Sequence, residues 1–349
     1  FTKENRYCRS IGILGEYYMC YKIEKQRKIE QKLAKELKDI PDFISDFFDR
    51  YKSAATKRVN WIYIRDMLNW MINNKYINKQ SIAEINETDM QIITSNNLIK
   101  YLNELKNGFL GRTNSLDSIN TKKNVFSAFW NYLRQNKYVD DNVISHIPGN
   151  LYKSEKRYKE VEIPTDEQVE KFLVNITDGN KNEFNIIRNI AIVQLIKGSG
   201  IRSEELINMD ISDLHLYEEK RPYMMILGKG NIQEYDKVYM SEQARMNIEE
   251  YLKIRTFFVT ERKIKDNALF LSNENNRLSK GAITGFFNLY SEGEIYPHML
   301  RHWVGSKLYE ETKDIVLVQR QLRHKNLETA ARYYVHMDES TIADAVLDL

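Results

Sequence analysis

The chain has 349 residues, 42% of them hydrophobic, with 5 prolines and 14 glycines, which is typical of a globular, mainly helical protein large enough for two domains. Its 52 basic and 49 acidic residues give a formal charge of +3, which neither requires nor excludes a nucleic-acid partner. Apolar runs of about 18 residues, as a membrane span needs, are absent, and Cys8 and Cys20 provide neither a disulfide framework nor a zinc site.

Residues 1–40 are predicted to form an N-terminal extension. Within them, residues 24–39 place Ile29, Leu33 and Leu37 at a spacing of four among charged residues, which predicts one amphipathic helix. We expect this helix to pack through that single stripe, and a partner-binding arm is the alternative.

Residues 41–148 are predicted to form a compact helical DNA-binding domain that begins at Pro41, a residue typical of helix starts. Apolar side chains recur at helical spacing, so they are expected in the core. They are Trp61, Ile64, Leu68 and Met71 in one helix, and Val125, Phe126, Phe129, Trp130 and Leu133 in another. Basic residues at the helix starts either contact DNA phosphates or are only solvated. They are Lys52, Lys57, Arg58, Arg112, Lys122 and Lys123.

Residues 149–162 are rich in charge and poor in apolar side chains, and prolines flank them, which predicts an interdomain linker. If the protein binds duplex DNA, a flexible, basic linker would let the two domains close around it from opposite sides. Four of its side chains are then expected to touch the DNA backbone: Lys153, Lys156, Arg157 and Lys159.

Residues 163–349 are predicted to form the second domain, with a first helix capped by Thr165. An apolar helix is expected to stop at Gly198 and Gly200, and residues 221–240 are typical of a β-hairpin around GKGN. Helices are predicted from there to the end of the chain. The expected fold class is therefore mainly α with a small β-sheet: a helical N-terminal domain followed by a mixed α+β domain.

The polar side chains of this second domain suit one kind of chemistry. Two guanidiniums fit the non-bridging oxygens of a phosphodiester and stabilise the extra charge of its transition state. A phenol can attack phosphorus, an imidazole can take the phenol's proton, and a lysine can protonate the leaving oxygen. In chain order the candidates are Arg202, Lys229, His298, Arg301, His324, Tyr333 and Tyr334.

This set predicts phosphoryl transfer without a metal or any other cofactor, because no carboxylate cluster gathers near it in the sequence. Each member alone has an ordinary structural explanation: Arg202 could cap a helix, and Lys229 could be a turn lysine. The GKG turn is not a phosphate-binding Walker loop, because the upstream glycine and the downstream Ser or Thr are missing. The ordered set, rather than any one residue, carries the prediction.

In this order the residues resemble the tyrosine recombinase family, which includes phage and transposon integrases and the Xer resolvases. The family's pattern is an arginine in a G-x-R-x-x-E-L box, a hairpin lysine, H-x-x-R, then L-G-H-x-x-x-x-T and a tyrosine. Here the matching segments are GIRSEEL with Arg202, LGKGN with Lys229, HMLRH with His298 and Arg301, and LRHKNLETAARYY with His324 and the tyrosine. The resemblance covers about residues 163–337, whereas residues 41–148 resemble the family's core-binding domain only in size and pattern.

The sequence departs from the family pattern at two places. Arg323 stands where the family usually has a glycine, and the tyrosine is doubled. The family most often places the nucleophile nine positions after the histidine, which selects Tyr333, but members with ten exist and would select Tyr334. His302 and His336 match no motif position and are expected to be structural.

The resemblance implies a site-specific DNA recombinase, acting in integration, excision or transposition, that cuts and rejoins strands through a 3′-phosphotyrosine. Tyr333 would attack a DNA phosphate and release a 5′-hydroxyl, and a 5′-hydroxyl of another strand would then attack the ester. The alternatives are a catalytically idle DNA-binding regulator of the same fold, a type IB topoisomerase or telomere resolvase, and a metal-dependent nuclease built on the histidines.

The implied partners are a double-stranded recombination site and further copies of the chain. The C-terminal tail carries Ile342, Ala345 and Val346 on one stripe, and it is expected either to fold back or to dock on a neighbour and build a tetramer on DNA. A composition rich in Lys and Asn suggests an AT-rich bacterial genome. The expected location is the bacterial cytoplasm, in association with the nucleoid and with no membrane partner.

Overall fold

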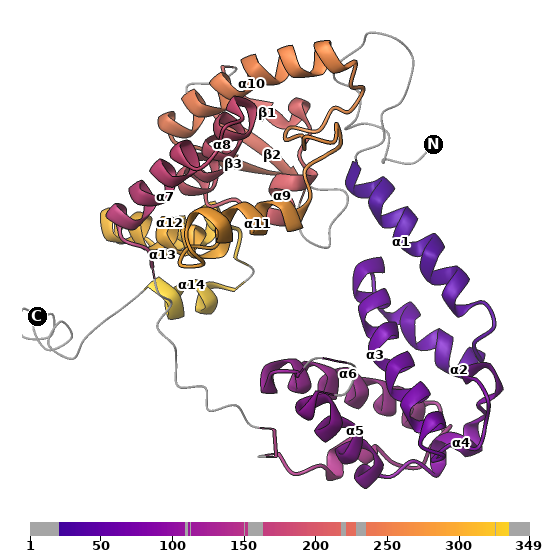
Figure 1. The fold of residues 1–349 in the computed structure, drawn as a ribbon. Helices are drawn as coiled ribbons and strands as arrows, with labels where there is room; N and C mark the ends of the chain where they lie inside the picture. Colours follow the sequence, from indigo (N-terminus) through magenta and orange to yellow (C-terminus); the bar gives the residue numbers. More distant parts are fainter. Residues whose placement is uncertain are drawn as a thin grey trace, which may run out of the picture. The chain divides into compact units, whose positions relative to one another are not determined.

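The structure is a computed structural model that describes residues 21–108, 111, 113–149, 151–152, 163–217, 221–227, 235–324 and 326–334. The chain divides between Arg157 and Tyr158 into two compact units, and we call their described parts, residues 21–152 and 163–334, the first and the second unit. The fold is mainly helical with one small sheet, which confirms the predicted class (Figure 1). The predictions on residues 1–20, 153–162 and 335–349 concern segments outside the described residues. Every helix in the described residues is too short or too polar to cross a bilayer.

The first unit consists of α-helices joined by short connections and 3₁₀ turns. Ser53 and Ser115 cap its two longest helices, α3 and α6, by accepting hydrogen bonds from the main chain of the first turn. The α-helices are α1 (Tyr21–Leu37), α2 (Asp42–Ser45), α3 (Ala54–Asn73), α4 (Glu87–Gln91), α5 (Ser95–Asn107) and α6 (Leu116–Gln135). Helix α1 packs on α3 and buries Leu33, which confirms the predicted amphipathic helix that packs through one stripe.

The core of the first unit is built from aromatic side chains. Trp61 and Trp130 are at most 2% exposed. The Phe47 ring packs edge-on against Phe129 with 5.1 Å between centroids, and Phe48 packs in the same way on Trp61 at 5.8 Å. The predicted core residues are therefore confirmed, except that Val125 is only half-buried. These rings hold the 3₁₀ turn Asp46–Arg50 against α3 and α6.

The second unit begins with two helices whose ends follow from the sequence. Thr165 caps α7 (Asp166–Asp178) by accepting from the Gln168 main chain, while the Gln168 side chain accepts from the Thr165 main chain, as in a capping box. Helix α8 (Glu183–Ser199) passes through Gly198, so the prediction that this glycine stops the helix is wrong. A Cβ at Gly198 would lie 2.7 Å from the Ala244 Cβ of α10 (Glu242–Arg262), so this glycine permits close helix packing.

A three-stranded antiparallel sheet follows short helix α9 (Ser203–Asn208), in the order β1 (Leu214–His215), β2 (Tyr223–Leu227) and β3 (Tyr235–Tyr239). Leu227 pairs with Tyr235 at the open end of β2 and β3, which confirms the predicted hairpin. Its tip, residues 228–234, lies outside the described residues.

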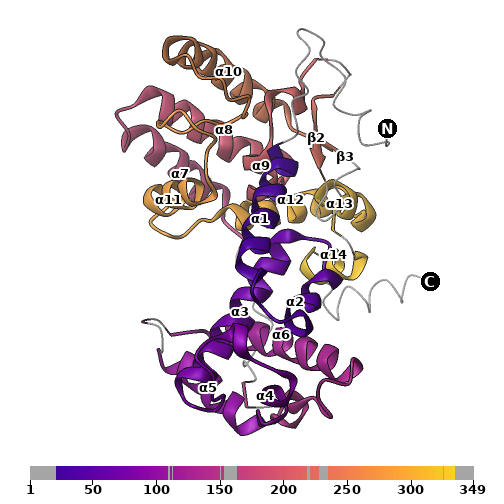
Figure 2. The ribbon, with the colours of Figure 1, turned by 90° about the vertical axis from the view of Figure 1, so that its right-hand side faces the viewer.

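The remaining helices of the second unit are α10, α11 (Lys280–Tyr290), α12 (Pro297–Thr312), α13 (Ile315–Leu322) and α14 (Leu327–Tyr334). Helix α8 packs against both α10 and α12. Helices α12, α13 and α14 contact one another and form a small cluster, which Figure 2 shows beside β3. This cluster brings the C-terminal motifs of the sequence to the end of α8.

Candidate active site

Arg301 lies at the centre of the site, on α12, with 1% of its surface exposed. Its guanidinium donates to the main-chain oxygens of Gly200, just after α8, and of Leu322, at the end of α13. Burial, together with the charges of Arg202 and Arg323, lowers the pKa of Arg301 to about 9, so it remains a cation at neutral pH. Arg301 therefore joins three helices and carries a charge that water cannot screen well.

Gly200 allows this approach for two reasons. Its φ of 69° lies in the left-handed region that caps α8, and a Cβ there would overlap the Leu322 side chain. The glycine before the motif arginine is therefore required both by the turn and by the close packing of α13.

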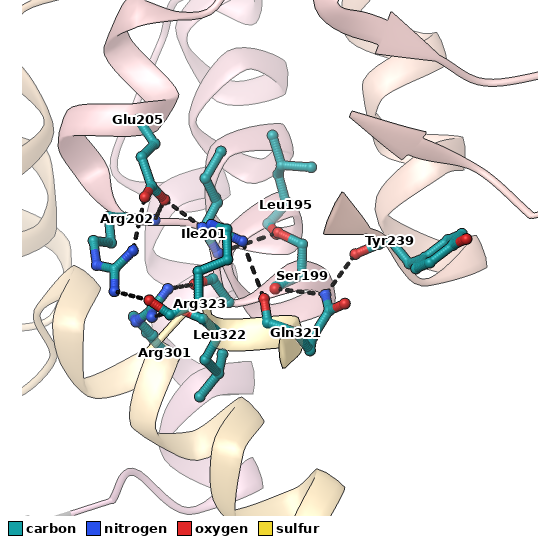
Figure 3. Close-up of polar contacts among 11 residues, drawn as sticks. Leu195, Ser199, Ile201, Arg202, Glu205, Tyr239, Arg301, Gln321, Leu322 and Arg323 are labelled. Carbon is teal, nitrogen blue, oxygen red and sulfur yellow. Dashed lines mark hydrogen bonds and ion pairs between the residues drawn. The ribbon is translucent and has the colours of Figure 1, made fainter. Parts of the chain in front are cut away.

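Arg202 is the residue that precedes α9, and it is held beside Arg301 by polar contacts at both terminal nitrogens. Its Nη1 lies 2.8 Å from Glu205 Oε1, and its Nη2 donates to the main-chain oxygen of Arg323 at 3.1 Å. Figure 3 shows that Arg202 and Arg323 flank Glu205, with Arg301 close below them. Two guanidiniums thus converge on the main-chain oxygens of the turn after α13.

Three imidazoles lie next to these arginines. Burial and the neighbouring positive charges lower the pKa values of His298, His302 and His324, to about 4 for the last two. The rings of His298 and His302 meet edge-on at 4.6 Å between centroids. No described residue forms a hydrogen bond with His324 Nδ1, although this atom is buried. The imidazoles are therefore neutral at pH 7, and the hydrogen-bonding capacity of the buried His324 Nδ1 is satisfied by no described residue.

The two adjacent tyrosines of α14 occupy different environments. Tyr334 is 3% exposed, its ring stacks parallel to His324, and its hydroxyl lies 3.2 Å from His302 Nδ1. Burial raises the pKa of Tyr334 to about 12. Tyr333 is 37% exposed, and its ring centroid lies 4.9 Å from that of His302. Both phenols therefore contact the same imidazole, one from inside the unit and the other from its surface.

The structure brings most of the predicted site residues into one contiguous cluster. They are Arg202, His298, Arg301, His324 and Tyr333, with Tyr334 among them. Lys229 lies outside the described residues, at the tip of the hairpin.

Two members of the cluster were not predicted as site residues. His302 was expected to be structural, yet it contacts His298 and both phenols. Its spacing of four from His298 was the signal, because residues four apart lie on one helix face. Arg323 stood out in the sequence only as a departure from a motif, and it forms an ion pair with Glu205 at 2.5 Å.

The cluster can bind and polarise a phosphodiester. Guanidiniums and a neutral imidazole supply hydrogen bonds and charge for the phosphoryl oxygens, and the exposed phenol supplies a nucleophile. In the described part of the chain, no three His, Cys, Asp or Glu side chains gather closely enough to hold a metal ion.

Comparisons with known proteins agree with this geometry. The model of the phage integrase family matches residues 163–341. The tyrosine recombinase XerD of Rickettsia prowazekii (strain Madrid E) is 26% identical over 321 residues, which cover 88% of this chain and 96% of that protein. The tyrosine recombinase XerC of Caldanaerobacter subterraneus subsp. tengcongensis is 30% identical over 274 residues, which cover 75% of this chain and 71% of that protein.

Solved structures share the fold. The Tn1549 transposon integrase in complex with circular intermediate DNA superposes with a TM-score of 0.58 at 16% identity, over 78% of this chain and 90% of that one. The XerH site-specific recombinase bound to its difH substrate, before cleavage, superposes with a TM-score of 0.55 at 23% identity, over 78% of this chain and 74% of that one.

Proposed function

The chain belongs to the phage integrase family, and we propose that it is a site-specific DNA recombinase that cuts and rejoins strands through a 3′-phosphotyrosine intermediate. One observation carries the proposal: Arg202 and Arg301 converge on the turn that precedes His324, and α14 brings two phenols to the same place. XerD and XerC relatives, which are named tyrosine recombinases, support the same function.

Arg202 and Arg301 are proposed to hold the non-bridging oxygens of the scissile phosphate. Arg301 points its charge from a buried position, where the local dielectric is low, so it stabilises the extra negative charge of the transition state more strongly than an exposed arginine would. His298 and His324 are proposed to donate hydrogen bonds to the same phosphoryl group, and the free Nδ1 of His324 suits that role.

Tyr333 is proposed as the nucleophile because its phenol is exposed to incoming DNA, whereas Tyr334 is buried against α12. The Tyr333 oxygen forms a bond to phosphorus as the bond to the 5′-oxygen breaks, and an imidazole of the cluster takes the phenolic proton. Lys229, at the hairpin tip, would protonate the leaving 5′-oxygen. A 5′-hydroxyl from another strand then attacks the phosphotyrosine and restores the phenol, so no high-energy cofactor is consumed.

The first unit is proposed to bind the DNA beside the cleavage site. A groove of about 290 Å³ between α1 and α3 is lined by Lys25, Lys28, Lys32 and Arg58, which favours phosphate binding. The predicted basic positions Lys57 and Arg58 also lie near carboxylates, at 3.2 Å from Asp49 and 4.0 Å from Glu36. Residues 41–148 would then be the core-binding domain, and residues 149–162 the linker to the catalytic domain.

The active assembly is proposed to be a tetramer on DNA, joined by the C-terminal tail, in the bacterial cytoplasm near the nucleoid. Integration, excision and transposition all fit this chemistry. A chain that ends at residue 338 tests the tail, since it should bind one DNA site but lose cooperative assembly on two. Cooperative assembly by the truncated chain would contradict the tetramer proposal.

The decisive experiment traps the covalent intermediate. The protein is incubated in EDTA with site DNA that carries a nick near the cleavage position, so that the released 5′ fragment diffuses away and religation stops. We expect a covalent protein–DNA complex, and mass spectrometry of its peptides identifies the attached residue. Tyr333→Phe should abolish the complex, while Tyr334→Phe should retain it.

The outcomes separate the alternatives. Tight DNA binding without any covalent complex in the wild type would favour an idle regulator, and cleavage that needs Mg²⁺ would favour a nuclease. Attachment at Tyr334 would preserve the proposed function and transfer the nucleophile's role to the buried phenol.

A further inference from the structure

Arg323 occupies the turn after α13 in a backbone conformation that arginine rarely adopts. Its φ of 53° lies in the left-handed region, where a side chain with a Cβ is strained. Glycine is the residue that fits such a turn without strain. Lys263 and Lys313 adopt the same conformation at the ends of α10 and α12, so what distinguishes Arg323 is the set of contacts that its side chain makes.

Those contacts are buried and charged. Arg323 Nη2 lies 2.5 Å from Glu205 Oε2, and the two side chains are only 9% and 8% exposed. Arg323 Nη1 also donates to the main-chain oxygen of Gln321 at 3.0 Å. Because a buried charge without its partner is costly, Glu205 and Arg323 fix each other's positions.

Glu205 also holds Arg202, so the ion pair acts on the proposed phosphate clamp. Besides its contact with the Arg202 side chain, Glu205 accepts the main-chain N–H of Arg202 at 2.9 Å. The other terminal nitrogen of Arg202 donates to the main-chain oxygen of Arg323. Both ends of the Arg202 guanidinium are therefore fixed through Arg323, once through its main chain and once through its side chain and Glu205 (Figure 3).

The charges of these three side chains matter as much as their positions. Burial disfavours ionisation of Glu205, but the charges of Arg323 and Arg202 and the hydrogen bonds from Arg202 outweigh it and hold its pKa below the ordinary value. An ionised Glu205 paired with Arg202 alone would neutralise that arginine and compete with a phosphate for it. A second guanidinium on the same carboxylate leaves one net positive charge on the group.

We propose that Arg323 is a positioning residue for Arg202: it holds Glu205 in place and offsets its negative charge, so that Arg202 keeps a fixed direction and an effective positive charge toward the DNA phosphate. The inference rests on the proposed function, which gives Arg202 that role. It does not require Arg323 itself to touch DNA.

The test compares Arg323→Gly and Arg323→Lys with a matched control, Lys313→Gly. Lys313 follows α12 with a φ of 52° and is exposed, so its replacement by glycine relieves the same backbone strain without touching the cluster. For each variant we would measure the single-turnover rate of covalent-complex formation at saturating nicked DNA. The Kd for DNA and the melting temperature are measured for the same variants.

Arg323→Gly should slow covalent-complex formation about 10- to 100-fold, the scale of a misplaced catalytic group, while the Kd changes less than about threefold. Arg323→Lys should recover part of the rate because it restores the charge beside Glu205, and Lys313→Gly should react like the wild type. A wild-type rate for Arg323→Gly would overturn the inference. Absence of the covalent complex in the wild type would instead overturn the proposed function.

Arg323→Lys keeps the inference testable if Arg323→Gly folds poorly, and Glu205→Gln adds a second, independent measurement. Without the carboxylate charge there is nothing for Arg323 to offset, so Glu205→Gln combined with Arg323→Gly should react about as fast as Glu205→Gln alone. Losses that multiply in the double variant would show that the two residues act independently and would overturn the inference.

Discussion

The two units bury different kinds of side chain. In the described residues of the first unit the buried polar residues are only Asn60 and Asn142, within a core of aromatic and aliphatic groups. The second unit buries three arginines and a histidine as well as its apolar core: Arg188, Arg255, Arg301 and His302. Apolar burial therefore stabilises the first unit, whereas the second unit holds cations whose desolvation costs free energy.

The buried arginines also show that burial alone does not mark the site. Arg188 donates to the main-chain oxygen of Leu271, and Arg255 donates to that of Ala268, so both tie loops to helices. Arg301 binds main-chain oxygens in the same way. Arg301 differs from the other two in its neighbours, which are a second arginine, imidazoles and phenols. These neighbouring side chains favour a catalytic role for Arg301.

The largest expected effect tests this distinction between buried arginines. Arg301→Ala should slow covalent-complex formation by about 100- to 1,000-fold, because a fixed charge on the phosphate is lost. Arg255→Ala is the matched control: it leaves main-chain oxygens without a donor just as Arg301→Ala does, so both variants should be destabilised. The single-turnover rate of covalent-complex formation, corrected for the folded fraction measured by urea unfolding, should be much lower for Arg301→Ala than for Arg255→Ala. An equal loss of rate in both would show that Arg301 acts only through stability.

A core substitution in the first unit should instead act on the stability of that unit. Trp130→Ala removes a fully buried ring from the aromatic core and should lower the free energy of unfolding of that unit by about 3–5 kcal/mol. Hydrogen exchange, read peptide by peptide, should show faster exchange in residues 21–152 and little change in residues 163–334. Equal acceleration in both units would mean that they unfold together.

This difference between the two units also explains how much of the structure could be predicted from the sequence. Periodic aromatic and aliphatic residues predicted the core of the first unit, since apolar burial follows helical spacing. The end of α8 was less predictable, because Gly198 serves close packing with α10 rather than termination. Gly200 does cap α8, as predicted, but nothing in the local sequence reveals that Ala244 lies against Gly198.

In the site, motif spacing predicted which residues meet but not how they are held. Arg202 and Arg301 are fixed largely by main-chain oxygens of residues 200, 322 and 323, and every residue type carries such oxygens. The ion pair between Glu205 and Arg323 joins residues more than a hundred positions apart. The spacing of nine positions predicted Tyr333 as the nucleophile, but the sequence could not show that Tyr334 is buried and Tyr333 exposed, because that depends on the direction that α14 gives each of them.

A glycine on α12 allows a smaller and more local test of the site. A Cβ at Gly305 would lie 2.7 Å from the Tyr334 hydroxyl oxygen and closer still to its ring, so Gly305→Ala should displace Tyr334 and cost about 1–3 kcal/mol. Gly285→Ala in α11 is the matched control, because a Cβ at that position would meet no atom within 4 Å. That substitution should instead stabilise the unit by about 0.5–1 kcal/mol. Thermal unfolding measures both, and a stable Gly305→Ala would contradict the close packing of Tyr334.

The last comparison concerns pH, and it again divides the two units. Burial lowers the pKa of His302 to about 4, below the value of about 6.5 expected in the unfolded chain. Between these values the unfolded chain binds more protons than the folded one, so the second unit should lose stability as pH falls from about 6.5 to about 4, by on the order of 3 kcal/mol for this residue.

In the described part of the first unit the sole histidine is His146, which is exposed, so that unit should change less over the same pH range. Hydrogen exchange at pH 7 and pH 5, corrected for the intrinsic exchange rate, measures the difference between the units. His302→Asn removes one titrating group while keeping a side chain able to bond the Tyr334 hydroxyl, so it should reduce the pH dependence of the second unit to the part that His298 and His324 contribute. If the wild type and this variant respond to acid equally, His302 is not the group that couples protonation to unfolding.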